Sequence, residues 1–437
     1  MKAEKVILVG GAAVALAFSA EAAFAQTAGS AGESIASAPI STNFARDRNV
    51  SVRARPRAEY EALGGHVGAF MLYPRLMVTG EYDDNIYALS TNKLSDEILR
   101  LQPELTLTSN WSRHQLTAYG RSTFHRYNSY SGEDSDEWTA GLNGRLDIRR
   151  DWNASVNLEA SRLTEPRTAT STQVDSVVPI QFETERANFT MVKEFNRLRL
   201  TGKVDYKDVD FNDGRSVTGA RVEQDDRDKK ETEGTVRAEY AISPDTAFFV
   251  QFAANKRNYD TPVPGLGAER DSDGYEVLAG ANFELSALVR GDIGVGYLAQ
   301  NYDSPIFDDI SGLGLRGQVE WFPTQLTTVT ITGQRQVLDA GITNAAGYIS
   351  TSAAAQVDHE LMRNLIVTGQ ISYAKDDYKD FPRDDKHFRF GASGTYLLNR
   401  MVGVTVGYSY YKETSSGLAA GPDYKVNKVG ATVTLQY

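Results

Sequence analysis

Hydrophobic and polar residues alternate with a period of two along most of this chain. Between positions 138 and 148 the even positions carry apolar residues or glycine and the odd positions carry mainly polar ones; 275–285 and 402–410 repeat the pattern. Successive side chains of a strand point to opposite faces, whereas an amphipathic helix repeats every 3.6 residues. Ten or so alternating residues suit a tilted strand with lipid on one face and water on the other. The pattern therefore predicts membrane-crossing strands.

The same period predicts about eighteen strands, an even number as in bacterial single-chain barrels. Their expected ranges are 68–83, 97–109, 113–127, 136–149, 152–163, 182–194, 197–211, 229–241, 246–259, 273–286, 288–302, 309–321, 325–338, 348–360, 363–377, 386–398, 401–412 and 425–437. Short turns, as at 150–151 and 195–196, alternate along the chain with long polar loops, as at 84–96, 164–181 and 212–228. Outer-membrane barrels sort their connections in this way. We expect an all-β, transmembrane, antiparallel up-and-down β-barrel over 67–437, with both termini in the periplasm.

The last ten residues form one of the cleanest alternating segments. Their apolar face carries Val429, Ala431, Val433, Leu435 and the terminal Tyr437. We expect this segment to close the barrel and to be the signal that the outer-membrane barrel assembly machinery reads. Alternation in ten residues also suits the edge of a soluble sandwich, so the prediction depends on the other strands.

The other end of the chain predicts export. Lys2 and Lys5 precede an apolar run over 6–18, and alanines at 23 and 25 form an A-x-A-type cleavage site. Such a run is too short to cross a bilayer, which needs about 20 apolar residues. We expect 1–25 to be a cleaved signal peptide and 26–66 to be a flexible, arginine-rich periplasmic segment.

A short basic block lies inside that segment. It contains Arg46, Arg48, Arg53, Arg55 and Arg57. One interpretation is a solvated stretch, which we favour; the other is a docking site for an acidic partner or for the inner leaflet of the membrane.

Composition narrows the function classes. The chain has no cysteine and a net charge of -11, which argues against a nucleic-acid partner because phosphate binding needs a basic surface. It is 41% apolar and contains 22 tyrosines and 18 phenylalanines, the residues that gather at bilayer interfaces. This balance favours a barrel with a hydrated lumen that contacts the lipid bilayer and lipopolysaccharide.

A charged side chain on the lipid face costs about 2 to 4 kcal/mol at the midplane, so we expect charged residues of the strands to face inward. The candidates for lining the lumen are Arg100, Glu104, Arg121, Arg145, Asp147, Glu159, Lys203, Asp205, Arg237, Glu239, Glu276, Glu284, Arg290, Asp292, Arg316, Glu320 and Arg389. Two interpretations remain open: a charged wall that selects the solute, or a network of ion pairs that fills and braces the barrel. Inward aromatics such as Tyr73, Tyr119 and Phe249 either stack on sugar rings or pack against their neighbours.

Signals for other chemistry are weak. Acidic pairs occur at strand tips and loops, namely Asp83-Asp84, Asp225-Asp226, Asp271 with Asp273, Asp308-Asp309, Asp376-Asp377 and Asp384-Asp385. They lack the ligand spacing of a Ca²⁺ loop, so we expect solvated loop charge rather than cations shared with lipopolysaccharide. No zinc-protease, nucleophile-elbow or phosphate-loop motif appears in the sequence. We predict no catalytic residue, metal or cofactor.

The N-terminal part of the chain resembles a known family. The residues that carry the resemblance are Arg55–Gly64, Gly68–Phe70, Tyr82–Tyr87, Ser95-Asp96, Pro103-Glu104, Ser109–His114 and Gly144–Asp147. They are similar to motifs of the outer-membrane family called putative β-barrel porin 2. Members of that family occur beside genes for exopolysaccharide and capsule export, so the resemblance implies a polysaccharide-secretion porin with no catalytic residues and with a periplasmic export protein as its partner.

These observations predict an outer-membrane channel that exports an exopolysaccharide or capsular polysaccharide. A general or solute-specific uptake porin is the first alternative. The second is a structural or adhesive surface barrel that transports nothing.

Overall fold

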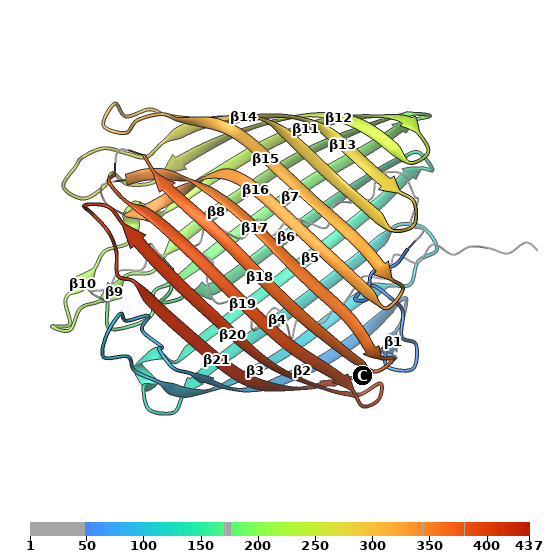
Figure 1. The fold of residues 1–437 in the computed structure, drawn as a ribbon, viewed down its shortest axis with the longest axis horizontal. Coiled ribbons are helices and arrows are strands. Elements are labelled where there is room, and N and C mark those ends of the chain that lie inside the picture. The colour runs from blue at the N-terminus through green and yellow to red at the C-terminus, as the bar shows by residue number, and fades with distance from the viewer. Residues whose placement is uncertain (1–48, 170, 172–175, 343–344, 380) are drawn as a thin grey trace, which may run out of the picture.

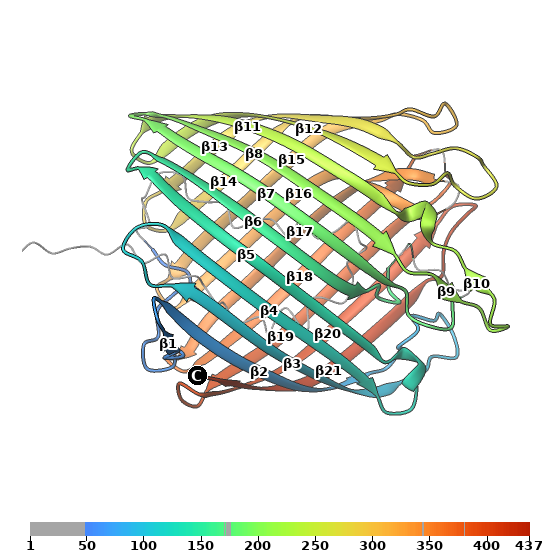
Figure 2. The same ribbon diagram turned by 180° about the vertical axis from the view of Figure 1, so that it is seen from behind.

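The fold is a closed barrel, seen side-on in Figure 1 and from behind in Figure 2. The computed structural model describes residues 49–437 except 170, 172–175, 343–344 and 380. The predicted signal peptide and residues 26–48 of the segment behind it therefore lie outside the described residues. Among the described residues, no helix is long and apolar enough to cross a membrane.

Eighteen long antiparallel strands form the wall, each next to its neighbour in the chain, so the prediction of about eighteen is confirmed. The first seven are β2 (Phe70–Asp83), β3 (Asp96–Ser109), β4 (Gln115–Tyr127), β5 (Ser135–Arg149), β6 (Trp152–Thr164), β7 (Gln181–Phe195) and β8 (Leu198–Phe211). The other eleven are β11 (Lys229–Ser243), β12 (Thr246–Tyr259), β13 (Ser272–Leu285), β14 (Val289–Tyr302), β15 (Ile310–Thr324), β16 (Thr327–Ile342), β17 (Ala345–Met362), β18 (Leu365–Tyr378), β19 (Asp384–Leu397), β20 (Val402–Ser416) and β21 (Tyr424–Gln436).

The last strand closes the barrel onto the first. β21 pairs with β2 over nine residues, from Arg75 opposite Gln436 to Asp83 opposite Lys428. Closure leaves the wall without a free edge, so the backbone donors and acceptors in the wall find partners without water. A three-residue strand, β1 (Gly65–Val67), adds to the end of β2. The expected closing role of 425–437 is therefore confirmed.

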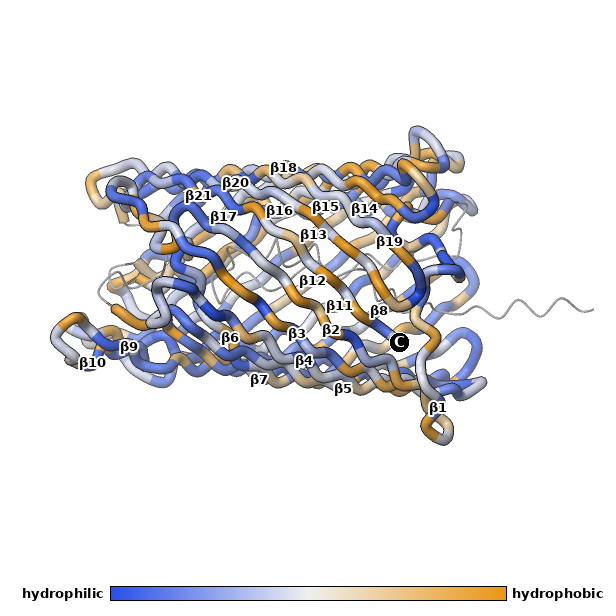
Figure 3. Tube along the Cα trace, turned by 90° about the horizontal axis from the view of Figure 1, so that it is seen from below, coloured by the Kyte–Doolittle hydropathy of each residue, from blue (hydrophilic) through white to orange (hydrophobic). Residues whose placement is uncertain are grey.

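Alternation separates two faces of the wall. On β3, Leu99, Leu101 and Leu105 are 53%, 38% and 54% exposed, whereas Arg100 between them is 7% exposed. Figure 3 shows apolar and polar positions alternating along the strands. In a closed barrel the face that carries the exposed leucines is the outer one, so the outer surface is apolar and the inner one polar.

Short and long connections lie at opposite ends of the barrel. The two-residue turns 150–151, 196–197 and 244–245 are at the end that holds the C-terminus and β1 (Figure 1). The long loops lie at the other end, where 212–228 carries the small hairpin of β9 (Gly214–Arg215) and β10 (Arg221–Val222) and the 3-10 turn η2 (Asp225–Arg227). A second 3-10 turn, η1 (Ser131–Glu133), precedes β5.

One hairpin departs from the predicted ends. β16 runs to Ile342 and β17 begins at Ala345, where strands ending at 338 and beginning at 348 were expected. Pairing of β16 with β15 stops at Arg335 opposite Leu315, while pairing with β17 continues to Ile342 opposite Ala345. The tip of this hairpin therefore leaves the wall, and its contacts place it across the interior.

Candidate functional site

The inner face of the wall is the candidate site, and register decides which side chains share it. Arg100 lies opposite His125, Glu104 opposite Arg121, and Arg121 opposite Thr139 on the next strand. The same reading around the barrel puts all seventeen predicted lumen residues on the face opposite the exposed apolar side chains. A pairing slip of one residue would move each set to the wrong face, so the apolar pattern fixes their position.

Most of these charges meet an opposite charge on the same face. Arg237 Nη2 lies 2.7 Å from Glu239 Oε1 and also pairs with Asp292; Lys203 Nζ lies 2.5 Å from Asp205 Oδ2. The further pairs are Arg145–Asp147 (2.9 Å), Arg75–Glu104 (2.8 Å), Arg100–Glu81 (3.4 Å), Arg316–Glu276 (3.5 Å) and Arg290–Glu320. Such pairing offsets the cost of taking each charge out of bulk water. This geometry favours the bracing interpretation for these residues.

The predicted aromatic residues are also engaged. The Arg237 guanidinium lies 3.5 Å from the centroid of the Phe249 ring, which is only 4% exposed. The Tyr119 hydroxyl donates to Glu159 Oε2 at 2.5 Å. Phe249 is thus covered and packs against its neighbours, which is the second of the two interpretations given for the inward aromatics.

Residues 49–64, which we call the strap, run along the short-turn end of the barrel. From Asn49 to Tyr60 the strap touches successive strand ends: the Arg290 guanidinium bonds the Asn49 carbonyl, the Val52 amide bonds Thr328 Oγ1, and the Gln436 amide bonds the Tyr60 carbonyl. Val52 is fully buried. The strap therefore belongs to the folded barrel and lines one side of its mouth.

Three arginines hold the strap to β17. Arg53 Nε lies 2.8 Å from Asp358 Oδ1, and Arg55 and Arg57 lie 2.8 and 3.1 Å from Glu360 Oε2. Arg57 is 3% exposed. The favoured expectation of a solvated basic block is wrong for these three residues, because their partners are acids of the same chain; Arg46 and Arg48 lie outside the described residues. Asp358 and Glu360 alternate on β17 as inward residues do, so the period could have revealed them.

The opposite mouth is narrowed by segments that fold inward. In the 165–180 loop, Arg167 makes two bonds of 3.0 and 2.7 Å to Glu133, and Glu165 pairs with Arg227 from the next long loop. The Tyr424 hydroxyl on β21 bonds the Thr168 carbonyl at 2.9 Å. Contacts between β21 and the β6–β7 loop reach over the strands between them, so this loop lies over the interior.

The β16–β17 tip adds a second inward segment. Asp339 pairs with Lys229 of β11 and, at 2.6 Å, with Arg257 of β12, although β13, β14 and β15 stand between those strands and β16 in the wall. Arg270 Nη2 also bonds the Ile342 carbonyl at 2.9 Å. The sequence shows no local sign of this crossing, since Asp339 is one aspartate among many.

Acidic pairs at the loops have cationic or amide partners. Asp83 pairs with Lys428, Asp226 with Arg270 and Asp385 with Arg383, while Asp84 accepts from the Asn427 amide. On β18, Asp376 Oδ2 lies 2.8 Å from His387 Nε2, whose other nitrogen bonds the Tyr411 hydroxyl. Basic neighbours repel a divalent cation. Among the described residues, no cluster has three or more His, Asp or Glu placed to hold one.

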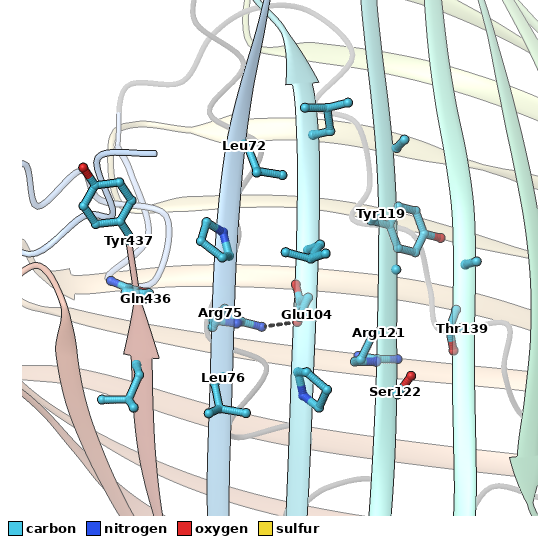
Figure 4. A pocket seen from close by; sticks show the side chains of 18 of the residues that line it. Leu72, Arg75, Leu76, Glu104, Tyr119, Arg121, Ser122, Thr139, Gln436 and Tyr437 are labelled. Atoms are coloured by element: carbon cyan, nitrogen blue, oxygen red, sulfur yellow. Dashed lines mark hydrogen bonds and ion pairs between the residues drawn. The ribbon is translucent and has the colours of Figure 1, made fainter. Parts of the chain in front are cut away.

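A shallow apolar groove lies on the outer face, over β2 to β5. Small outward residues Ala118, Gly120 and Ala140 form its floor, between the larger Leu105 and Trp138. Figure 4 shows this region, with the Arg75–Glu104 ion pair joining β2 and β3 through the wall's inner side. Pro103 has no amide hydrogen to donate, and the pairing of β3 with β4 is interrupted beside it. The groove faces the membrane and is separate from the charged interior.

Comparison with known proteins identifies the family. None of the curated proteins matches the sequence. Among solved structures, OpdK from Pseudomonas aeruginosa with vanillate aligns over 84% of this chain and 99% of its own at 10% identity and a TM-score of 0.44. OccAB3 from Acinetobacter baumannii aligns over 85% and 100% at 10% identity and 0.45, and the copper transporter OprC over 86% and 81% at 9% identity and 0.47.

The sequence match is more extensive. The family model described as putative beta-barrel porin 2 matches residues 57–437, which is nearly the whole barrel together with the end of the strap. The resemblance noted in the N-terminal motifs therefore extends to the C-terminus. The protein is an outer-membrane, porin-like β-barrel, and the chain belongs to the putative β-barrel porin 2 family.

Proposed function

We propose that this barrel is the outer-membrane channel through which an exopolysaccharide or capsular polysaccharide leaves the cell. The observation that carries the proposal is family membership over the whole barrel, combined with an interior that is polar on every strand. A wall of eighteen strands encloses more space than its side chains fill unless segments fold into it. In this scheme the paired interior charges line and brace the lumen, and selection is left to other residues.

The proposal includes an orientation and partners. The signal peptide 1–25 would be removed, the strap and both termini would face the periplasm, and Val429, Ala431, Val433, Leu435 and Tyr437 would be read by the barrel assembly machinery. The barrel would contact lipid and lipopolysaccharide outside and the polysaccharide within. A periplasmic polysaccharide export protein would hand the polymer over at the short-turn end.

Removing residues 67–437 from the native gene tests the export role. We expect surface polymer to disappear while polymer made inside the cell persists, and a copy of the full chain to restore secretion. Unchanged secretion would reject the proposal. Restoration also shows that the loss does not come from a neighbouring gene.

A closed, structural barrel is the second candidate, because two inward segments narrow the mouth at the long-loop end. Planar-bilayer recordings separate the two. Steady conductance favours a channel, whereas a folded, purified barrel without conductance favours the structural role. If small solutes block the current and polymers do not, an uptake porin is favoured instead.

A further inference from the structure

One third of the inner wall, six of its eighteen strands, is almost free of charge in its middle part. On β16, β17 and β18, every inward position at 330–334, 352–356 and 370–374 is threonine, serine, glutamine or alanine. On β19, β20 and β21 the inward positions at 391–395, 405–409 and 430–434 are glycine, serine or threonine. We call these positions the neutral wall. Arg389 lies just above them on β19, with its guanidinium 5.1 Å from the Tyr411 ring centroid.

The rest of the inner wall is rich in charge. On β7 and β8 the inward positions include Arg186, Lys203 and Asp205, and the Arg186 and Lys203 side chains both pair with Asp205, at 2.8 and 2.5 Å. The Arg237 network lies on the neighbouring strand β11. These charges satisfy one another, so they present few free ionic groups to a passing chain.

Several polar groups of the neutral wall are available. Within the part of the chain that the structure describes, the side chains of Gln334, Ser352, Gln370 and Ser372 make no hydrogen bond to protein, and all four are partly exposed. The Gln370 amide lies against Gly391, where a side chain would collide with it. The wall therefore offers hydroxyl and amide groups, each able both to donate and to accept.

The ends of the neutral wall carry acids. Asp358 and Glu360 lie at the short-turn end and are paired with the strap arginines, and Asp376 and Glu413 lie at the long-loop end around His387. Tight recognition of carboxylate or sulfate groups uses arginine forks that are not already paired with acids. Arg53, Arg55 and Arg57 are bound to carboxylates at one end, and Arg383 is bound to Asp385 at the other. A polyanion would therefore gain little and would pass near four acids.

We propose that the neutral wall is the path of the exported polymer and that the polymer is uncharged and rich in hydroxyl groups. This inference rests on the proposed export function. Sugar hydroxyls can exchange their bonds to water for bonds to the threonine, serine and glutamine side chains at small net cost, so the chain is held weakly at many positions and keeps moving.

The probes are dextran oligomers and dextran sulfate oligomers of the same length, added to the full mature protein in planar bilayers. We expect dextran to interrupt the current at a concentration at least tenfold lower than dextran sulfate. The variant S352A/Q370A should raise the dextran concentration needed at least threefold. The matched control Q115A/S155A removes one glutamine and one serine from the charged part of the wall, where both are partly exposed and face inward with Arg145, and should leave the dextran block unchanged.

The outcomes separate the inference from the function beneath it. If dextran sulfate blocks as well as dextran or better, or if S352A/Q370A behaves like its control, the neutral path is overturned while polymer export stands. If neither polymer blocks and small sugars do, export itself fails in favour of uptake. A barrel without any conductance overturns both.

Discussion

Docking of the strap depends on two carboxylates of β17, and removing their charge should release it. Glu360 accepts from Arg55 and Arg57, and Asp358 accepts from Arg53, so D358N/E360Q leaves three charged guanidinium groups facing neutral amides. The hydrogen bonds can remain, but the Coulomb attraction between the paired charges is lost. For an ion pair near the protein surface this attraction is worth up to about 1 kcal/mol. We therefore expect the strap to lose up to about 3 kcal/mol of docking free energy.

The rate of trypsin cleavage within the strap measures this loss of docking free energy. It cleaves after arginine unless proline follows, so Arg57-Ala58 is a site and Arg55-Pro56 is not. Arg57 is 3% exposed in the docked strap, so cleavage there requires the strap to open. Where opening is fast, cleavage follows the open population, and about 3 kcal/mol corresponds to roughly a hundredfold faster cleavage.

The control is E183Q, which removes a charge from the Arg162–Glu183 pair at the long-loop end, far from the strap. Both variants and the parent are folded in detergent, and cleavage at Arg57-Ala58 is followed by mass spectrometry. Equal cleavage rates in the parent and in D358N/E360Q would refute the argument that these ion pairs hold the strap. Equal acceleration in E183Q would show a general loosening of the barrel instead.

Three further predictions concern the wall and the long-loop end. Replacing outward Leu142, which is 39% exposed, with arginine should lower the free energy of unfolding by about 2 to 4 kcal/mol, measured with urea in liposomes. The same change at inward Asn143 should lower it much less, and equal losses would contradict the assigned faces. Burial, with help from Asp210, Asp225 and Asp260, raises the pKa of Asp228 in its loop to about 6. Because this folded-state pKa lies above the unfolded one, the free energy of unfolding should rise as the pH falls from about 6 toward 4, and this gain should be lost as the pH rises again. D228N should flatten this part of the plot of melting temperature against pH, measured between pH 4 and 8. E165Q should weaken the ion pair between Glu165 and Arg227 and increase proteolysis within 165–180. The control is E223Q, which neutralises an acid of the neighbouring loop. If E165Q is as resistant to protease as the parent, this ion pair does not hold the loop in place.

The strands could be predicted because each one carries its own pattern. Lipid on one face and water on the other require apolar and polar residues to alternate at every position of a strand, and this pattern can be read locally. The lengths of the polar segments between strands distinguish short turns from long loops. Most observed ends lie within about three residues of the expected ones, as at β12 and β14. The exception is the β16–β17 tip, where consecutive residues such as Ala345 and Ala346 are both buried, in two apolar clusters, so that burial no longer alternates as it does in the wall.

The partners of the charges could not be predicted in the same way. Alternation places Arg237 on the inner face, but it does not say that Asp292, fifty-five residues later, meets it there. The strap is the extreme case, since Arg57 and Glu360 are 303 residues apart. A basic block in a polar segment looks solvated until the acids that face it are known, and only closure of the barrel brings them together.

The strap and the neutral wall are linked by the same two acids. Without the strap, Asp358 and Glu360 would present two negative charges at the entrance to a wall that is otherwise uncharged, because the next inward residues on β17 and β18 are glutamine, threonine and serine. With the strap docked, Arg53, Arg55 and Arg57 pair with those two carboxylates, so the three guanidinium groups and two carboxylates together carry one positive charge. Bare carboxylates that are partly removed from water would attract cations to the entrance. Docking of the basic block, which is far from β17 in sequence, thus removes two bare negative charges from the entrance of the proposed path.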